Sequence, residues 1–550
     1  MALLGEILLK NNVVTTQTLG VALSEQKRTG ELMGDVLVRL GFISQTDLSK
    51  ALAIASDIQF VDLQQTAIDP EAINTITKET AKKFNVVPFA ITDGRLQVAM
   101  DNPNDIIALD TLRHETGMAV DIFAADILRI ADTIEMYYEV GFSLGDEIDA
   151  NIRAAMGGAM VEGENQAPII RLVDLFIINA IRDTATDLHI TPEEKSTRIS
   201  YRIDGILQSS FVLPKQLHLP IINRVKIISG MDIAENRLPQ GGSINFAFIN
   251  RHIDIRCSST PCSHGENLVL RILDKASAVL DLKYLGLDQT KLNTIEQEII
   301  RPHGIILACG PTGAGKTTTL YSILRRVNAL EKNVLTIEDP IEYNLPLIKQ
   351  TQVNESAGLT FSMAIKYFLR QDPDIILVGE IRDLETAQIA MQAAMTGHLV
   401  LSTLHTNDAA AAIPRLLNLG VESFLIPSTL RSVISQRLAR KVCRNCAVDY
   451  RPAADELAQY DLPEDWLAAD QSIKKAVGCD KCGDTGYRGR TGVFEILKMS
   501  AAISALISQK SSSDIIMRQA VHDGMKTIRE DGLSKVLAGL TSLEEIFRIT

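Results

Sequence analysis

The chain has 550 residues, of which 46% are hydrophobic and 22% are charged, a balance that is ordinary for a globular protein. This length predicts three or more domains. The formal net charge of −13 disfavours a nucleic-acid-binding protein, which usually carries a basic patch or stripe, and it also disfavours membrane binding by charge alone.

The sequence shows no segment that would direct the chain into or through a membrane. There is no run of 18 or more apolar residues, so we expect no transmembrane helix. The first residues, MALLGEILLKNN, have neither the basic start nor the cleavage site of a signal peptide. The seven cysteines are an odd number, which argues against a disulfide framework. We therefore expect a cytoplasmic protein.

Residues 1–56 carry a weak internal repeat. The segment LLGEIL at 3–8 recurs as LMGDVL at 32–37. Its spacing predicts pairs of short helices that stack on each other. A helical module that serves only for packing is the plain alternative to a binding role.

Residues 57–138 predict a small α/β domain. Strands are expected at 60–63, 86–91 and 96–100, with a hairpin turn at Asp93-Gly94. Helices are expected around 70–83 and 104–116. Residues 139–166 contain several glycines and little periodicity, which predicts a linker.

Two further α/β regions follow. Residues 167–280 predict helices near 167–183 and 216–229, with strands at 187–191, 198–203, 206–211, 243–248, 252–258 and 267–273. From about 281 to 550, apolar strands alternate with helices, as is typical of a doubly wound, mostly parallel sheet.

The segment that begins at Gly310 fits the phosphate-binding pattern GxxxxGK[ST]. The candidate nucleotide-binding residues are Gly310, Pro311, Thr312, Gly313, Ala314, Gly315, Lys316, Thr317 and Thr318. A buried strand at 304–309 leads into this loop and a helix follows it, which is the context the motif requires. The glycines let backbone N–H groups surround the phosphates of ATP, Lys316 reaches the outer phosphates, and Thr317 is a ligand for Mg²⁺. The alternative is a glycine-rich turn that binds no nucleotide.

Three further strands end in polar residues. The strand at 374–380 ends in Glu380, which is expected to hold Mg²⁺ through water, although a buried strand can also end in a solvated glutamate. The strand at 333–337 precedes Glu338, our candidate general base; a merely charged loop is the alternative. His398 and His405 flank the fourth strand, and either could contact the phosphates or serve the structure.

Together these four segments resemble the Walker A, aspartate, Walker B and histidine boxes of the secretion ATPases of type II secretion and type IV pilus systems. The stretches LRQDPDIILVGEIRDLETAQIA and TGHLVLSTLHTND are similar to that family throughout. Residues 200–205 and 231–240 resemble its second N-terminal domain, and the end of the chain resembles its C-terminus. The resemblance implies a multidomain α/β fold, with a RecA-like motor domain at 281–550 after a PAS-like domain at 167–280.

The resemblance also implies a homohexamer that binds ATP between the motor domain and the domain before it. In that arrangement Arg256 and Arg271 approach the phosphates, where guanidinium groups stabilise transition-state charge. Without the resemblance, both are plain surface arginines. The implied partners are the membrane platform and other cytoplasm-facing components of a secretion or pilus machine, and the implied location is the cytoplasmic face of the inner membrane.

Two CxxC pairs, Cys443/Cys446 and Cys479/Cys482, are separated by 32 residues. Such pairs in a cytoplasmic chain predict a tetrahedral Zn²⁺ site, and the lack of an open ligand position indicates a structural role. A redox-active pair is the alternative. The resulting zinc module is expected at about 440–495, with a helical excursion around 453–470. The following Arg488 and Arg490 resemble a family segment near the nucleotide.

The repeat in 1–56 resembles the cyclic di-GMP-binding module of some pilus and secretion ATPases. Each repeat of that module begins Arg-Leu-Gly, but here Leu3 and Leu32 occupy the arginine positions. Leucine can neither stack on guanine as arginine does nor donate a bidentate pair. We therefore predict a helical module without tight cyclic di-GMP binding.

The predicted function is a hexameric, Mg²⁺-dependent ATPase that powers a type II secretion pseudopilus or a type IV pilus assembly machine. The segments Ser263–Glu266 and Thr351–Asn354 favour the secretion member, although Asn267 stands where many members have a basic residue. A nucleotide-gated scaffold with slow turnover remains an alternative. A DNA-translocating motor is disfavoured by the acidic composition.

Overall fold

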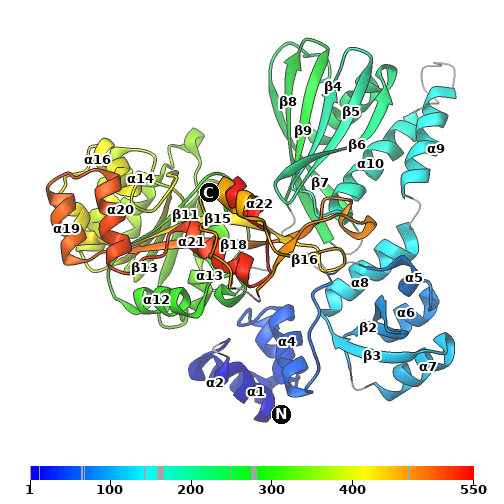
Figure 1. Cartoon of the computed structure of the whole chain (residues 1–550), viewed down its shortest axis with the longest axis horizontal. Coiled ribbons are helices and arrows are strands. Elements are labelled where there is room, and N and C mark those ends of the chain that lie inside the picture. Colours follow the sequence, from blue (N-terminus) through cyan, green and yellow to red (C-terminus); the bar gives the residue numbers. More distant parts are fainter. Residues whose placement is uncertain are drawn as a thin grey trace. The chain divides into compact units, whose positions relative to one another are not determined.

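The computed structural model describes residues 2–273 and 281–550, apart from positions 12, 64, 65, 67, 104, 141–143, 158–165, 249, 250, 469 and 470. The chain divides into two compact units, Met1–Ala278 and Val279–Thr550, and Figure 1 shows their elements. Within the described ranges, no helix has both the length and the apolar character needed to cross a bilayer.

The first unit begins with four helices, α1 (Ala2–Lys10), α2 (Thr16–Thr29), α3 (Met33–Arg39) and α4 (Gln45–Ala55). The repeat glycines lie at close contacts between these helices. A Cβ on Gly5 would be 3.2 Å from Leu19, and one on Gly34 would be 2.8 Å from Leu48. Close packing therefore explains why both repeats contain glycine here. Leu32 is 63% exposed, and the absence of tight cyclic di-GMP binding stays a prediction.

The next region has a three-stranded sheet of β1 (Val86–Thr92), β2 (Arg95–Met100) and β3 (Ala119–Ala124). Its helices are α5 (Pro70–Ile73), α6 (Lys78–Phe84), α7 (Ile106–Thr116), α8 (Ile127–Glu135) and the π-helix η1 (Met136–Val140). The expected hairpin turn is present, with positive φ at Asp93 and Gly94. The strand expected at 60–63 is only a single parallel bridge, from Phe60 to Ala124 at the end of β3. The strand β3 itself, which pairs with β2, was not expected.

The segment predicted as a linker, 139–166, contains the helix α9 (Leu144–Gly157), which its low periodicity did not indicate. Ile148, Ile152 and Ala155 recur at helical spacing and pack into the core that α10 (Gln166–Arg182) shares. Arg171 and Glu147 add an ion pair of 2.6 Å between the two helices. The glycines of the segment concealed this apolar stripe.

The rest of the first unit is a six-stranded antiparallel sheet in the order β6-β5-β4-β9-β8-β7. The strands are β4 (Asp187–Pro192), β5 (Ser196–Ile203), β6 (Ile206–Pro214), β7 (Gln240–Phe248), β8 (Arg251–Cys262) and β9 (Gly265–Leu273). Two helices, α10 and α11 (His218–Ser229), contribute to the same apolar core, with η2 (Lys215–Leu217) before α11. The six strands agree with the sequence prediction; the PAS-like character of this region stays a prediction.

The second unit is built on a seven-stranded sheet in the order β12-β11-β13-β14-β10-β15-β18. The strands are β10 (Gly304–Cys309), β11 (Val334–Glu338), β12 (Lys349–Gln352), β13 (Ile375–Val378), β14 (Leu399–Leu404), β15 (Leu430–Val442) and β18 (Tyr487–Lys498). Only the pairing of β18 with β15 is antiparallel. Alternate residues of β10 pack into two different hydrophobic cores. Ile305 and Leu307 belong to one core, and Ile306 and Ala308 belong to the other. Because both faces are covered, the prediction of a doubly wound, mostly parallel sheet is confirmed.

The other helices of the second unit are α12 (Gln289–Ile300), α13 (Lys316–Arg326), α14 (Phe361–Phe368), α15 (Leu384–Met395), α16 (Ala412–Asn418), α17 (Leu425–Thr429), α18 (Ala454–Gln459), α19 (Ala501–Ser508), α20 (Ser513–His522), α21 (Ile528–Leu537) and α22 (Leu543–Ile549), with 3₁₀ turns η3 (Leu282–Tyr284), η4 (Glu355–Ala357) and η5 (Asp480–Cys482). Strands β16 (Val448–Tyr450) and β17 (Ile473–Lys475) pair outside the main sheet. The excursion expected around 453–470 contains one short helix, α18.

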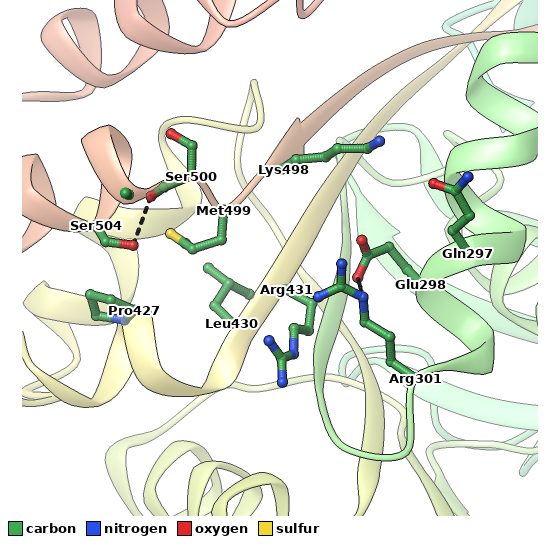
Figure 2. A pocket seen from close by; sticks show the side chains of 11 residues that line it. Gln297, Glu298, Arg301, Pro427, Leu430, Arg431, Lys498, Met499, Ser500 and Ser504 are labelled. Atoms are coloured by element: carbon green, nitrogen blue, oxygen red, sulfur yellow. Dashed lines mark hydrogen bonds and ion pairs between the residues drawn. The ribbon is translucent and has the colours of Figure 1, made fainter.

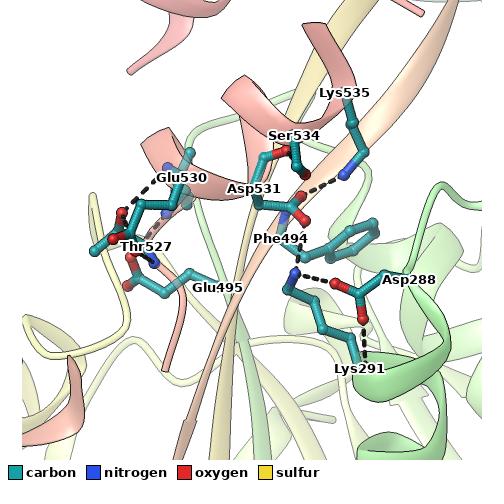
Figure 3. Close-up of polar contacts among 10 residues, drawn as sticks. Asp288, Lys291, Phe494, Glu495, Thr527, Glu530, Asp531, Ser534 and Lys535 are labelled. Atoms are coloured by element: carbon teal, nitrogen blue, oxygen red, sulfur yellow. Dashed lines mark hydrogen bonds and ion pairs between the residues drawn. The ribbon is translucent and has the colours of Figure 1, made fainter. Parts of the chain in front are cut away.

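A buried ion cluster, shown in Figure 3, fixes α21 to the sheet and to α12. Asp531 accepts hydrogen bonds from the backbone N–H of Phe494 (2.9 Å), from the ammonium of Lys291 (2.6 Å) and from Lys535. Asp288 gives Lys291 a second carboxylate at 2.7 Å. Buried charges are tolerated only when they are paired in this way.

Candidate active site and metal site

Four predicted motifs follow four neighbouring parallel strands of the seven-stranded sheet. Register pairs place Cys309 beside Leu404, Val378 beside Ser402, and Ile337 beside Val378. The strands β11, β13, β14 and β10 therefore end at one edge of the sheet. The P-loop and the backbones of Glu338, Glu380 and His405 lie along this edge, where ligands bind in open α/β sheets.

The P-loop has the conformation that its glycines permit. Gly310, Gly313 and Gly315 have φ values of 143°, 78° and 88°, a region that favours residues without a side chain. Lys316 begins α13, is only 8% exposed, and donates hydrogen bonds to the carbonyl oxygens of Gly310 (2.8 Å) and Pro311 (3.0 Å). Burial lowers the pKa of its ammonium.

The remaining loop residues have different exposures. Thr312, Gly313 and Thr317 are exposed, Thr318 is half-buried and Ala314 is buried. An exposed Thr317 in the first turn of α13 can offer its hydroxyl to a cation that accompanies the phosphates.

Glu380 and His405 are close together. The carboxylate of Glu380 accepts a hydrogen bond from Arg382, and its other oxygen lies 3.4 Å from Nε2 of His405. Arg382 also lies 3.7 Å from a carboxylate oxygen of Asp339. The charge of Glu380 opposes the effect of burial on Lys316, so these two groups share one electrostatic environment. His398, in contrast, bonds Thr396 and the Ala393 carbonyl at the other end of β14.

Glu338 is oriented differently from what the sequence suggests. Its side chain is 3% exposed, and its carboxylate accepts hydrogen bonds from Tyr321, from Thr336 (2.5 Å) and from Gln350 (3.1 Å). Burial and the bond to Glu338 both raise the pKa of the Tyr321 phenol. These three donors and the burial hold the carboxylate inside the protein, so little of it is open to a water at the sheet edge in this conformation. Its role as a base stays a prediction.

Arg256 and Arg271 lie in the first unit, on adjacent strands and directly opposite each other. On the next strand, β4, Asp187 is the register partner of Arg271 and continues this row across the sheet. Its carboxylate forms ion pairs with Arg271 at 3.0 Å and with Arg202 at 3.7 Å. Directly paired residues of antiparallel strands share a face, so three guanidinium groups follow one line across the sheet. Arg271 is 59% exposed and Arg256 is also exposed. Their approach to the nucleotide stays a prediction.

Sequence reasoning missed two residues beside the P-loop, Gln436 and Arg437 of β15. The Gln436 amide oxygen accepts a hydrogen bond of 2.6 Å from Thr319, and a Cβ on Gly315 would lie 2.8 Å from its amide nitrogen. A Cβ on Gly310 would lie 2.5 Å from the Gln436 carbonyl oxygen and 3.4 Å from Nη1 of Arg437. The sequence signal that could have indicated them is the adjacent polar pair Gln436-Arg437 within the long strand LRSVISQRLARKV.

The four predicted cysteine ligands form one cluster. All four sulfur atoms lie within 4.8 Å of one another, with separations of 3.9 Å for Cys443–Cys479, 3.8 Å for Cys446–Cys482 and 3.7 Å for Cys479–Cys482. Four sulfurs at about 2.3 Å around a tetrahedral metal would be roughly 3.8 Å apart. Backbone N–H groups of Gly478 and other residues also point at these sulfurs. The set therefore fits a metal that prefers thiolate ligands.

The pocket shown in Figure 2 is not the nucleotide site. Its volume is about 270 Å³, and it lies where β15 begins and β18 ends, at the sheet edge opposite the P-loop. Arg301, Arg431 and Lys498 line it, and Glu298 is the single acid.

Comparisons with known proteins agree with this geometry. A family model described as type II/IV secretion system protein matches residues 162–548, and the MshEN domain model matches residues 56–143. The chain is 40% identical to a type IV pilus assembly ATPase of Myxococcus xanthus, over 99% of this chain and 98% of that protein. It is 38% identical to a type II secretion system protein E of Xanthomonas campestris, over 96% of this chain and 94% of that protein. It is 46% identical to a type II secretion system protein E of Aeromonas hydrophila, over 71% of this chain and 77% of that protein.

Among solved structures, the ATPase DotB of Legionella pneumophila is similar with a TM-score of 0.50 and 22% identity, over 69% of this chain and 95% of that one. This likeness concerns the fold alone. The family model covers more than half of the chain, and the P-loop stands in the structural context that the motif requires. The chain therefore belongs to the type II/IV secretion system protein family and is one of its P-loop ATPases.

Proposed function

We propose that this chain is a homohexameric, Mg²⁺-dependent ATPase that powers a type II secretion pseudopilus or a type IV pilus assembly machine. The observation that carries the proposal is the sheet edge at which Lys316 lies near the Glu380–His405 pair. Relatives with both kinds of name match nearly the whole chain. The motor acts at the cytoplasmic face of the inner membrane, with the membrane platform and cytoplasm-facing components as partners and no nucleic acid.

The residues of this edge divide the work on ATP. Backbone N–H groups of residues 310–318, except Pro311, which has none, would surround the phosphates, and Lys316 would neutralise the outer ones. Thr317 would hold Mg²⁺ directly and Glu380 would hold it through water; when bound, this ion would supply neutralising charge. His405 orients Glu380 through their 3.4 Å contact. Glu338 orients the attacking water once it has left its buried partners.

The first unit supplies the remaining charge. Arg256 and Arg271 are proposed to approach the phosphates when the domain at 167–280, of PAS-like fold, closes on the motor domain at 281–550. The exposed row of guanidinium groups supports this, because its three positive charges are offset by the single carboxylate of Asp187, and the remaining positive charge favours an anion. The proposed organisation before it is a helical module (1–56), a small α/β domain (57–138) and a connecting segment (139–166).

The cysteine cluster, within the module at about 440–495, is proposed to bind structural Zn²⁺. The separations between its sulfurs support this choice. The helical module is proposed not to bind cyclic di-GMP tightly, because Leu3 and Leu32 replace the arginines of the related pattern.

Steady-state phosphate release tests the motor. We expect turnover by the wild type with Mg²⁺ and ATP under assembly conditions, and a loss of about 10³-fold or more in Lys316→Ala, because an outer-phosphate cation is removed. Lys332→Ala is the matched control, since Lys332 is exposed and pairs with Asp374. Equal inactivity of the wild type and Lys316→Ala would reject the motor.

A nucleotide-gated scaffold with slow turnover is the second candidate, and the buried carboxylate of Glu338 is the observation that favours it. A scaffold would bind ATP and change its assembly state in both the wild type and Glu338→Gln. A motor would lose its turnover in Glu338→Gln while it still binds ATP.

A further inference from the structure

The segment between β14 and α16, residues 405–411, crosses the carboxyl edge of the sheet; we call it the His405 loop. It begins with His405 and is anchored on three strands that follow one another in the sheet. Cys309 of β10 donates to the Asp408 carbonyl oxygen at 3.4 Å. Glu495 of β18 accepts from the Ala409 N–H at 2.9 Å. Between them, Arg437 of β15 donates to the Asn407 carbonyl oxygen at 2.5 Å.

Two of these anchors also adjoin the P-loop: Cys309 precedes Gly310 in the chain, and the side chain of Arg437 approaches the loop from the neighbouring strand β15. Nη1 of Arg437 donates to the Gln436 carbonyl oxygen at 3.1 Å, and the same carbonyl lies against Gly310. The guanidinium itself would be 3.4 Å from a Cβ on Gly310. One planar, rigid group therefore lies between the first glycine of the P-loop and the His405 loop.

The electrostatics of Arg437 agree with this position. Burial lowers its pKa, while the nearby charges of Glu495 and Asp408 act in the opposite direction. The positive charge of Arg437 in turn acts with burial to lower the pKa of Lys316. The two cations near Gly310 repel each other, and bound phosphates would stabilise both by adding negative charge beside them.

We propose that Arg437 is a positioning residue that holds the His405 loop against the P-loop. It thereby fixes the Glu380–His405 pair relative to the phosphates that Lys316 binds. The inference rests on the proposed ATP hydrolysis. A lysine cannot replace Arg437 fully, because a single ammonium does not reproduce the planar, two-pronged geometry that joins the Gln436 and Asn407 carbonyls.

The test is steady-state kinetics on full-length hexamers, with ADP affinity measured in parallel. We expect Arg437→Gln to lower kcat roughly tenfold or more, because small displacements in an active site cost rate, while KM for ATP and Kd for ADP change less than about threefold. Arg437→Lys should recover part of the loss. Arg431→Gln is the matched control: it lies on the same strand at the opposite edge and bonds His303. It should keep the wild-type kcat.

A double-mutant cycle shows whether Arg437 acts through the loop. If it does, Arg437→Gln combined with His405→Ala should be no more than about twofold slower than His405→Ala alone, because both changes disturb one unit. Additive losses, a wild-type kcat in Arg437→Gln or in His405→Ala, or a loss of ADP affinity that matches the loss of kcat would each overturn the proposal. A wild type as inactive as Lys316→Ala would instead reject the proposed motor.

Discussion

The P-loop edge of the seven-stranded sheet and the cysteine cluster lie in the same compact unit, but they are held by different means. The residues of the edge come from several parallel strands, and their polar groups have protein partners: Lys316 has carbonyl oxygens, Glu380 has Arg382, and Glu338 has Tyr321. The four cysteine sulfurs come from two short CxxC loops and contact mainly one another and a few backbone N–H groups.

This difference predicts different mechanical behaviour. Hydrogen bonds to charged groups such as these contribute about 1.5–3 kcal/mol each, so the P-loop edge can exchange partners during a cycle. A thiolate–metal centre contributes far more and permits only one geometry. We therefore expect the edge to rearrange during a cycle and the cluster, with metal bound, to keep its shape.

Removal of metal from the cluster should have the largest effect. Structural Zn²⁺ in small modules contributes about 10 kcal/mol or more of apparent binding free energy at neutral pH. We expect one Zn²⁺ per chain in the wild type and none in Cys443→Ser, with local unfolding that the fluorescence of the single tryptophan reports, since Trp466 packs in the neighbouring core.

Cys262→Ser is the matched control, because Cys262 is an exposed thiol outside the cluster. It should retain the metal and the wild-type fluorescence. If the wild type remained folded without metal, the cysteine cluster would not depend on metal for its shape, and the proposed difference from the P-loop edge would be wrong.

The next effect tests whether the P-loop edge is complete within its own unit. If Arg256 of the first unit stabilises charge on the transferred phosphoryl group, Arg256→Gln should lower kcat by about 10³-fold, as loss of an arginine finger does. Arg198→Gln is its control, since Arg198 lies on β5 of the same sheet and pairs with Glu193. Equal kcat values for the two variants would mean that the second unit holds a self-sufficient site.

Local patterns predicted much of this architecture, and long-range contacts were the part that they could not predict. The P-loop, its strand and its helix are adjacent in sequence, so one motif indicated all three. The contact of Gln436 with Gly315 depends on β15 pairing with β10 more than 100 residues away, a register that no local pattern contains. The buried orientation of Glu338 depends in the same way on Tyr321 of α13.

A third prediction concerns the C-terminal helix α22. An ion pair, with no metal involved, joins this helix to β15. Glu545 is fully buried and accepts hydrogen bonds from Arg440 (2.8 Å) and Arg548 (2.6 Å). Burial alone raises the pKa of Glu545, but these hydrogen bonds outweigh it and lower the pKa. Glu545→Gln should lower the free energy of unfolding by about 2 kcal/mol at neutral pH, because Arg440, whose side chain is 15% exposed, loses its buried counter-charge, and the exposed Arg548 loses the same partner.

The pH dependence gives this prediction a sign. A carboxyl group whose pKa is lowered by folding stabilises the protein above the ordinary glutamate pKa, and the stabilisation is lost as pH falls through the lowered value. The gap in urea midpoint between the wild type and Glu545→Gln, followed by Trp466 fluorescence, should therefore be constant near neutral pH and close in acid. Glu544→Gln, at the exposed neighbouring residue, should show no gap. A gap that persists in acid would assign the effect to packing instead of charge.

The smallest effect tests the claim that the P-loop edge exchanges partners. Tyr321→Phe keeps the ring that packs edge-on against Tyr343 at 5.4 Å but removes the hydroxyl donor to Glu338. Stability should fall by about 1.5 kcal/mol. If Glu338 must leave this donor to orient water, the same change makes release easier, and kcat should rise by up to about fivefold. Tyr367→Phe, on an exposed ring, should alter neither quantity. A fall in kcat would show instead that Tyr321 holds Glu338 in its working position, because a base that already acts from the buried site would lose an interaction that it needs.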